Sequence, residues 1–309
     1  MSAVKAVKGS LSRASIQNAH VHAATITVLF HIPEQGMKQP ELLTRGTTFC
    51  TPHPNTGKLA FFTPAHVAAP WKFPRYYPQD WLKFVEPQHC IYTLNARNLK
   101  MYSSDGTNDG HYFFGRVELH PTRDVAAFYL EDEDAALKDM KRKELKLEPV
   151  RLRDSPLMKG EFVDIAGFEV EDESEATFRD EVEIIVEGES AAERLETKNS
   201  LEGDLRRQYP LGMRAEVSLR TQNQVFARTR ELLNDGMCGA PAIDGKKMCA
   251  GMVEGIARMP NEGEVMPPGY DKVAGHACLL EGPLLEQFLR RGVGEDALGK
   301  AWNMTHVRK

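Results

Sequence analysis

The chain has 309 residues, of which 27% are charged and 8% are aromatic, and its formal net charge is −5. A chain of this length can bury a substantial core, and two subdomains of ordinary size fit within it. The sequence has no basic surplus and no run of about 18 apolar residues, so we expect neither nucleic acid as a partner nor a membrane span.

Residues 1–22 form a basic N-terminal extension. The segment carries Lys5, Lys8 and Arg13, and the first acidic residue of the chain is Glu34. It lacks the apolar core of a secretory signal, and we therefore expect a cytoplasmic protein. Basic, hydroxyl-rich and acid-poor segments are also typical of mitochondrial presequences, so a mitochondrial location remains the alternative.

The cysteines do not form a pairing pattern. They are odd in number and include no C-x-x-C pair: Cys50, Cys90, Cys238, Cys249 and Cys278. This argues against a disulfide framework and against a zinc knuckle. The histidines show no spacing typical of metal ligands, and we expect no metal and no cofactor.

Strands are predicted in the first part of the chain. The β-branched run at 23–32 indicates one strand. Residues 46–50 and 59–67 read as two more, joined by a polar turn, with His66 at the end of the second. The aromatic stretch 70–90 predicts a packed loop, or a short helix near 79–85, with a substrate-binding wall as the alternative.

Asp124 opens an apolar strand that continues to residue 130. Burying a carboxylate without a partner costs several kcal/mol, so we expect a partner such as an imidazole N–H. The charged stretch 131–148 has acids first and bases later, as the helix dipole prefers, and predicts a solvated helix. The alternative reading of this stretch is an interaction surface.

The second half of the chain also reads as strands and turns. We expect a turn at 103–111, and strands at 182–186, 211–228 (one or two), 248–257 and 275–280. Residues 187–210 are polar enough to be an insertion. Pro283 is placed to open a helix that ends at Gly292.

The stretch 234–241, NDGMCGAP, places a cysteine between two glycines and before a proline. Gly236 lets the backbone approach a substrate, so that the amides of Gly236 and Cys238 could both point at one oxygen. This is the layout of a nucleophile beside an oxyanion hole.

This loop resembles the Gly-x-Ser-Gly-Gly-Pro nucleophile loop of the chymotrypsin-like (trypsin-fold) peptidases, with cysteine in place of serine and Ala240 where glycine is usual. Residues 46–50 and 63–67 resemble the Gly-x-Gly-Phe strand and the Thr-Ala-Ala-His motif of that family. Residues 124–130 resemble its Asp-Ile-Ala-Leu-Leu strand. Residues 150–157 and 159–168 are similar to the strand, turn and strand that start the second barrel in its HtrA/Deg branch, so the resemblance implies a strand in each. Viral chymotrypsin-like cysteine peptidases have the same cysteine substitution.

The resemblance implies an all-β fold of two six-stranded antiparallel β-barrels with a short C-terminal helix. The expected parts are the extension at 1–22, the first barrel at 23–148, the second barrel at 149–282, and the helix and tail at 283–309. The chain order of His66, Asp124 and Cys238 is also that of the family.

The resemblance further implies an endopeptidase with a polypeptide substrate. Cys238 would form a thioester, His66 would act as general base and acid, and Asp124 would orient His66. The backbone N–H groups of Gly236 and Cys238 would form the oxyanion hole. Leu232 and residues 254–256 hint at an apolar or mixed primary pocket.

The alternative is an inactive or weakly active pseudopeptidase that serves as a protein-interaction scaffold. The unusual nucleophile and the charged segments 131–148 and 187–210 favour this alternative.

Overall fold

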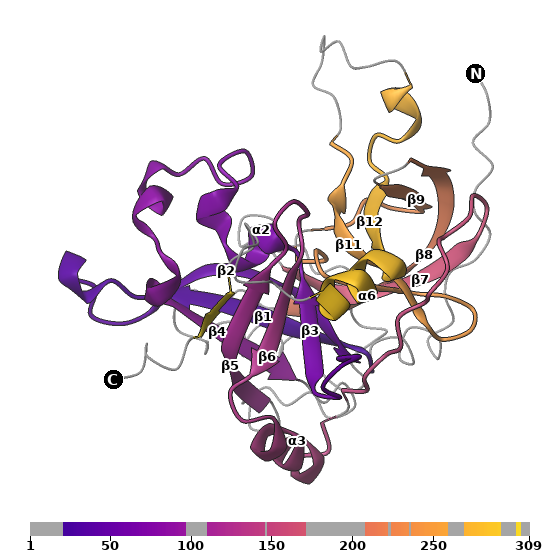
Figure 1. Ribbon diagram of the computed structural model, residues 1–309. Helices are drawn as coiled ribbons and strands as arrows, with labels where there is room; N and C mark the ends of the chain where they lie inside the picture. Colours follow the sequence, from indigo (N-terminus) through magenta and orange to yellow (C-terminus); the bar gives the residue numbers. More distant parts are fainter. Residues whose placement is uncertain are drawn as a thin grey trace, which may run out of the picture.

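The computed structural model describes residues 21–96, 110–145, 147–170, 208–221, 224–234, 236–258, 269–291 and 301–303. Within these residues the chain forms two closed, six-stranded antiparallel β-barrels that lie side by side, as Figure 1 shows. The predicted double barrel with a short C-terminal helix is therefore confirmed.

The first barrel closes in the order β5-β4-β1-β2-β3-β6, with β6 pairing back onto β5. Its strands are β1 (Ala23–Phe30), β2 (Glu41–Pro52), β3 (Leu59–Thr63), β4 (Cys90–Ala96), β5 (Gly110–Leu119) and β6 (Ala126–Leu130). A late strand, β13 (Ala301–Asn303), pairs with β5, so the tail of the chain returns to the first barrel. The sequence analysis did not predict this return.

The second barrel closes in the order β10-β11-β12-β9-β8-β7. Its strands are β7 (Phe162–Val170), β8 (Gln208–Arg220), β9 (Val225–Thr229), β10 (Pro241–Ile243), β11 (Cys249–Ile256) and β12 (Ala277–Glu281). The α-helices are α2 (Ala65–Ala68), α3 (Glu133–Arg142) and α6 (Gly282–Arg291). Short 3-10 helices lie at Pro33–Gln35, Pro70–Lys72, Asp80–Phe84, Pro87–His89 and Tyr270–Lys272.

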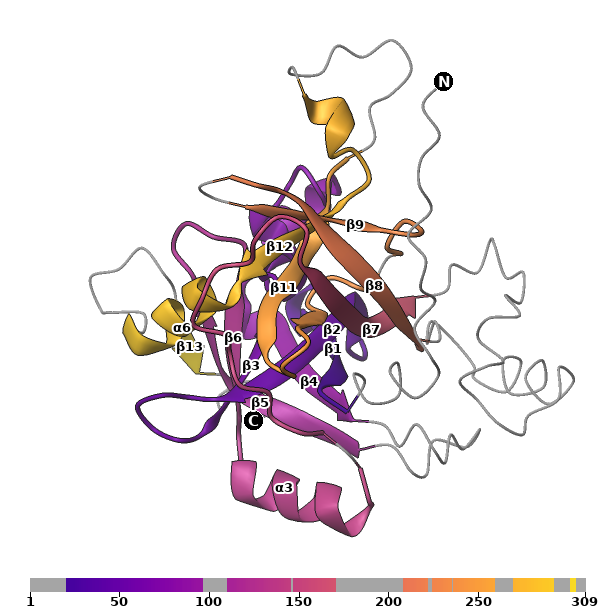
Figure 2. The ribbon, with the colours of Figure 1, turned by 90° about the vertical axis from the view of Figure 1, so that its right-hand side faces the viewer.

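Helix α3 covers the end of the first barrel, at the bottom of Figures 1 and 2. Asp132 caps its N-terminus by accepting a hydrogen bond from the backbone N–H of Ala135, and Ala136 and Met140 face the barrel core. The charged stretch therefore forms a helix with one buried face, shorter than the predicted 131–148.

Two apolar cores fill the barrels, and a third lies between them. Side chains alternate along a strand, so a strand at the contact between the barrels can serve two cores at once. In β3, Phe61 points into the first barrel, whereas Ala60 and Phe62 point into the shared core. This explains why every residue of β3 is buried. The shared core is completed from the second barrel and α6 by residues that include Met252, Leu280, Leu285 and Phe288.

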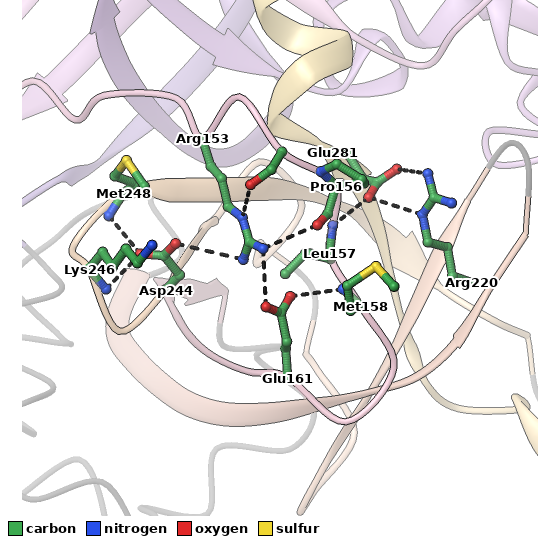
Figure 3. A network of polar contacts seen from close by, with 11 residues as sticks. Arg153, Pro156, Leu157, Met158, Glu161, Arg220, Asp244, Lys246, Met248 and Glu281 are labelled. Carbon is green, nitrogen blue, oxygen red and sulfur yellow. Dashed lines mark hydrogen bonds and ion pairs between the residues drawn. The ribbon is translucent and has the colours of Figure 1, made fainter.

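The predicted strand at 150–157 is wrong. Leu152 forms only an isolated bridge with Cys249, where Arg151 and Arg153 exchange backbone hydrogen bonds with Cys249, and side chains add further contacts. Figure 3 shows the Arg153 guanidinium contacting Glu161 and Asp244 and the carbonyl oxygen of Pro156.

Glu281 completes this network. It forms an ion pair with Arg220 and accepts a hydrogen bond from the backbone N–H of Leu157 (Figure 3). Polar contacts of side chains therefore supplement the few backbone hydrogen bonds that join 152–161 to β11 and β8.

The strand predicted at 182–186 and nearly all of the insertion at 187–210 lie outside the described residues, as does the extension up to residue 20. Of the turn predicted at 103–111, residues 103–109 lie outside them, whereas Gly110 and His111 already belong to β5. The strand predicted at 59–67 ends at Thr63, because Pro64 cannot continue the ladder, and His66 lies in α2 and not in the strand. The other predicted strands are present, with 211–228 divided between β8 and β9.

Candidate active site

His66 lies in the single turn of α2, directly after β3. Pro64 is extended and separates the strand from the helix, because proline lacks the N–H that a strand ladder needs. The hydroxyl groups of Thr44 and Tyr92 donate to the carbonyl oxygens of Val67 and Ala68, and these bonds fix the turn from both sides. His66 is therefore carried on a rigid, buried turn.

Asp124 holds His66 with both carboxylate oxygens. Oδ1 accepts the backbone N–H of His66 at 2.8 Å, and Oδ2 lies 2.6 Å from Nδ1 of the ring. Nδ1 is thus the protonated nitrogen that faces the carboxylate, and Nε2 is left for a partner on the other side of the ring. The structure supplies the imidazole partner that the sequence predicted for Asp124.

The surroundings of His66 favour its protonated form. Burial opposes the charge, but hydrogen bonds to Asp124 and to Cys238, together with the negative charges of both, outweigh it and raise the pKa of His66 to about 10. Cys238 is therefore a close neighbour of the imidazole. The structure brings the three predicted side chains together.

Two glycines shape the loop that carries Cys238. Gly236 and Gly239 both have positive φ, at 91° and 97°. A Cβ on Gly239 would lie 1.9 Å from the carbonyl oxygen of Thr47, so no other residue fits there without moving β2. The N–H of Gly239 donates to the carbonyl oxygen of Val253 at 2.8 Å, which ties the loop to β11.

Thr47 fastens this loop to the first barrel. Its backbone N–H donates to the carbonyl oxygen of Cys238, and its hydroxyl donates to the carbonyl oxygen of Gly236 at 2.8 Å. The same hydroxyl accepts the N–H of Phe168 from β7. One buried threonine therefore sets the position of Cys238 relative to the barrel that carries His66 and Asp124.

Cys238 differs from the other cysteines, although all five are free thiols. Cys238 is partly exposed, whereas the others are buried, and burial raises the pKa of each buried thiol to about 12: Cys50, Cys90, Cys249 and Cys278. The four buried thiols are therefore poor nucleophiles at neutral pH, and Cys238 is the most accessible of the five.

Aromatic rings line one side of His66. The rings of Phe73, Tyr76 and Tyr77 have centroids 6.1, 5.1 and 6.4 Å from the imidazole. Phe73 and Tyr77 also pack against the core of the first barrel, as the packed-loop prediction requires, while Tyr76 is 65% exposed. Tyr76 is thus placed to contact a molecule bound beside the imidazole.

The sequence analysis did not find the role of Thr47. This residue carries no local signal, because its position depends on contacts with the Cys238 loop and β7, which are far from it in the chain.

No group of His, Cys, Asp and Glu side chains among the described residues is arranged to bind a metal ion. In the same part of the chain, no helix is long and apolar enough to cross a membrane. The sequence matches no protein-family model and no curated protein.

Proposed function

We propose that the protein is a cysteine-type endopeptidase of the chymotrypsin-like fold. The observation that carries this proposal is the His66–Asp124 pair, with 2.6 Å between Nδ1 and Oδ2, and the Cys238 thiol among the groups that act on the imidazole. Nucleophile, base and orienting carboxylate in this relation are the parts of a catalytic triad. The double barrel and the order of the three residues along the chain support the same proposal.

In this mechanism the Cys238 thiolate attacks the carbonyl carbon of a peptide bond, while His66 keeps the thiol proton. The negative charge on the carbonyl oxygen is met by the backbone N–H groups of Gly236 and Cys238, which donate no hydrogen bond to another described residue. As the C–N bond breaks, His66 passes its proton to the leaving amine, and a thioester remains.

A water molecule then completes the cycle. His66 removes a proton from the water, which attacks the thioester carbon, and the C–S bond breaks to release the acid. Asp124 holds the imidazole in the required tautomer in both halves of the reaction. The substrate is a polypeptide, and the free thiols suit a reducing compartment such as the cytoplasm.

The test is site-resolved alkylation followed by a peptide-cleavage assay. With iodoacetamide at neutral pH, Cys238 should react much faster than the buried Cys278, and His66→Ala should slow it. A peptide library should be cut by the wild type and left intact by Cys238→Ala. The melting temperature of Cys238→Ala should change little, which shows that the variant is folded.

Equal alkylation of Cys238 and Cys278 together with an uncut library would overturn the proposal. The fold would then be used as a protein-interaction scaffold.

A further inference from the structure

His120 lies at the start of the short turn that carries Asp124, between β5 and β6. Two backbone hydrogen bonds close this turn. The N–H of His120 donates to the carbonyl oxygen of Val125, and the N–H of Val125 donates to the carbonyl oxygen of Arg123, each at 2.9 Å. Because the second bond spans a single residue, Asp124 is the central residue of a tight turn.

The His120 side chain binds the backbone of the same turn. Its Nδ1 lies 3.1 Å from the backbone nitrogen of Thr122 and 3.1 Å from that of Arg123. A backbone N–H can only donate, so Nδ1 accepts both hydrogen bonds and carries no proton. One ring nitrogen of His120 therefore holds the two residues that precede Asp124.

The C-terminal helix holds the His120 ring in place. The ring of Phe288 in α6 meets the imidazole edge to face, with centroids 5.1 Å apart and an angle of 62° between the planes. Phe288 is itself buried in the core between the barrels. Burial and the charge of Arg123, in the same turn, lower the pKa of His120. Both effects favour the neutral ring, which is the form that can accept at Nδ1.

The conformation of this turn determines how Asp124 meets His66. The carboxylate binds His66 at two points, over 2.8 Å to the backbone nitrogen and 2.6 Å to Nδ1. Hydrogen bonds weaken steeply when their distance or angle departs from the optimum. Rotation of the turn would therefore lengthen or bend at least one of these two bonds.

We propose that His120 is a positioning residue for the active site, which acts through Asp124 by accepting two N–H groups of the turn on its unprotonated Nδ1. The proposal rests on the function proposed above and adds a pH limit to the same site. Protonation of His120 places a hydrogen on Nδ1, and both hydrogen bonds are then lost. Because the pKa of His120 is lowered from its ordinary value of 6.5, this loss occurs in acid, below that pH.

The experiment uses four forms of the full-length chain: wild type, His120→Ala, His120→Asn and the control His53→Ala. Asparagine keeps an acceptor oxygen for the N–H groups of the turn but cannot be protonated. His53 makes a similar contact elsewhere, because its Nδ1 accepts the N–H of Asn55 at 3.1 Å and its ring lies against Tyr129. The control therefore loses the same kind of hydrogen bond in a turn that carries no residue of the site.

The hydrogen bond between His66 and Asp124 is followed by proton NMR. The Nδ1–H of His66 gives a downfield resonance while it is bound to the carboxylate, and the signal is assigned from its loss in His66→Gln. At neutral pH we expect this resonance in wild type, His120→Asn and His53→Ala, and its loss or broadening in His120→Ala. On acidification it should disappear at a higher pH in the wild type than in His120→Asn.

Peptide cleavage by the same four forms gives a second readout. His120→Ala should lower kcat by about 10-fold to 100-fold with little change in KM, because His120 positions Asp124 and does not contact the substrate. His120→Asn should cleave at close to the wild-type rate at neutral pH and keep its activity to lower pH. If His120→Ala does not fold, the comparison of wild type with His120→Asn in acid decides the question.

The outcomes separate this inference from the proposed function. If the wild type cuts no peptide and Cys238 is not alkylated selectively, the proposed function is wrong, and the NMR comparison still tests His120. If the His66 resonance and its pH dependence are the same in wild type, His120→Ala and His120→Asn, the role of His120 is wrong. Loss of the resonance at neutral pH in His120→Asn or in His53→Ala would overturn that role as well.

Discussion

Thr47 of the first barrel donates its backbone N–H to the carbonyl oxygen of Cys238 in the second barrel, over 2.9 Å. The distance between the thiol and the imidazole is therefore set by a contact between barrels and not by either barrel alone.

Removing the Thr47 hydroxyl should loosen the Cys238 loop. Thr47→Val loses the hydrogen bond to the carbonyl oxygen of Gly236 and leaves the Phe168 N–H without its acceptor, and we expect a loss of about 1–3 kcal/mol in stability. Alkylation of Cys238 should slow as well. Thr48→Val is the control, because it loses a buried bond to Phe62 at the same strand without touching the loop. Equal effects of both variants on the alkylation rate would contradict this assignment.

A side chain at position 239 should not be tolerated. Gly239→Ala combines positive φ with a clash against the Thr47 carbonyl oxygen, and we expect a loss of more than about 2 kcal/mol in stability. Gly245→Ala, where a Cβ meets nothing within 4 Å, should change stability by less than about 1 kcal/mol. Urea unfolding measures both variants, and similar midpoints for the two would show that the loop can move away from β2.

Asp124→Asn tests the effect of the Asp124 negative charge on His66 while the shape of the side chain is kept. The amide keeps the shape of the side chain but loses the negative charge that raises the pKa of His66. Peptide cleavage should fall on the order of 10²–10⁴-fold, while the melting temperature changes modestly. The exposed Asp154→Asn is the control and should cleave at the wild-type rate. A fully active Asp124→Asn would remove Asp124 from the mechanism.

The stability of the protein should depend on pH through Glu254. Its pKa rises from 4.5 to about 7 on folding, so between these values the folded state binds more protons than the unfolded state. This group therefore costs stability progressively as the pH rises from about 4 to about 7, and the full cost remains above that. Glu254→Gln cannot ionise, so its stability relative to wild type should be higher at pH 8 than at pH 5. Urea unfolding at the two pH values measures the difference, and an equal difference at both would contradict the shifted titration.

Arg153 should stabilise the second barrel through the network of Figure 3. Arg153→Met leaves Glu161 and Asp244 without this partner, and we expect a loss of about 1–3 kcal/mol in stability. The neighbouring Arg151→Met is the control, because Arg151 is exposed. Thermal unfolding of the two variants should differ by several degrees, and matching transitions would show that the segment is held by its backbone alone.

Much of the fold was predictable because its signals are local. The β-branched residues of β1 and the acidic start of α3 determine these elements within a few residues of sequence. Asp124 was predictable for a different reason, because a carboxylate beside an apolar strand needs a partner wherever that partner lies in the chain.

The remaining features depend on contacts that the sequence does not display. The segment 150–157 has the composition of a strand, but the side chain of Arg153 takes its contacts from Pro156 in the same segment and from Glu161 and Asp244 outside it. The pairing of β13 with β5, and the hydrogen bonds of Thr47 to the Cys238 loop, join residues that are far apart in the chain. The β-bulge at Glu254 in β11 depends on the register of two strands, which no local pattern specifies.

The apolar core between the barrels determines how the protein unfolds. Phe49 and Phe62 of the first barrel are fully buried there against residues of the second barrel and α6. Separating the barrels would expose these rings to water and, at roughly 25 cal/mol per Å² of apolar surface, would cost a large share of the total stability. Neither barrel is therefore an autonomous folding unit. Heating should unfold both barrels in a single calorimetric transition, and the arrangement of His66, Asp124 and Cys238 should be lost in that same transition.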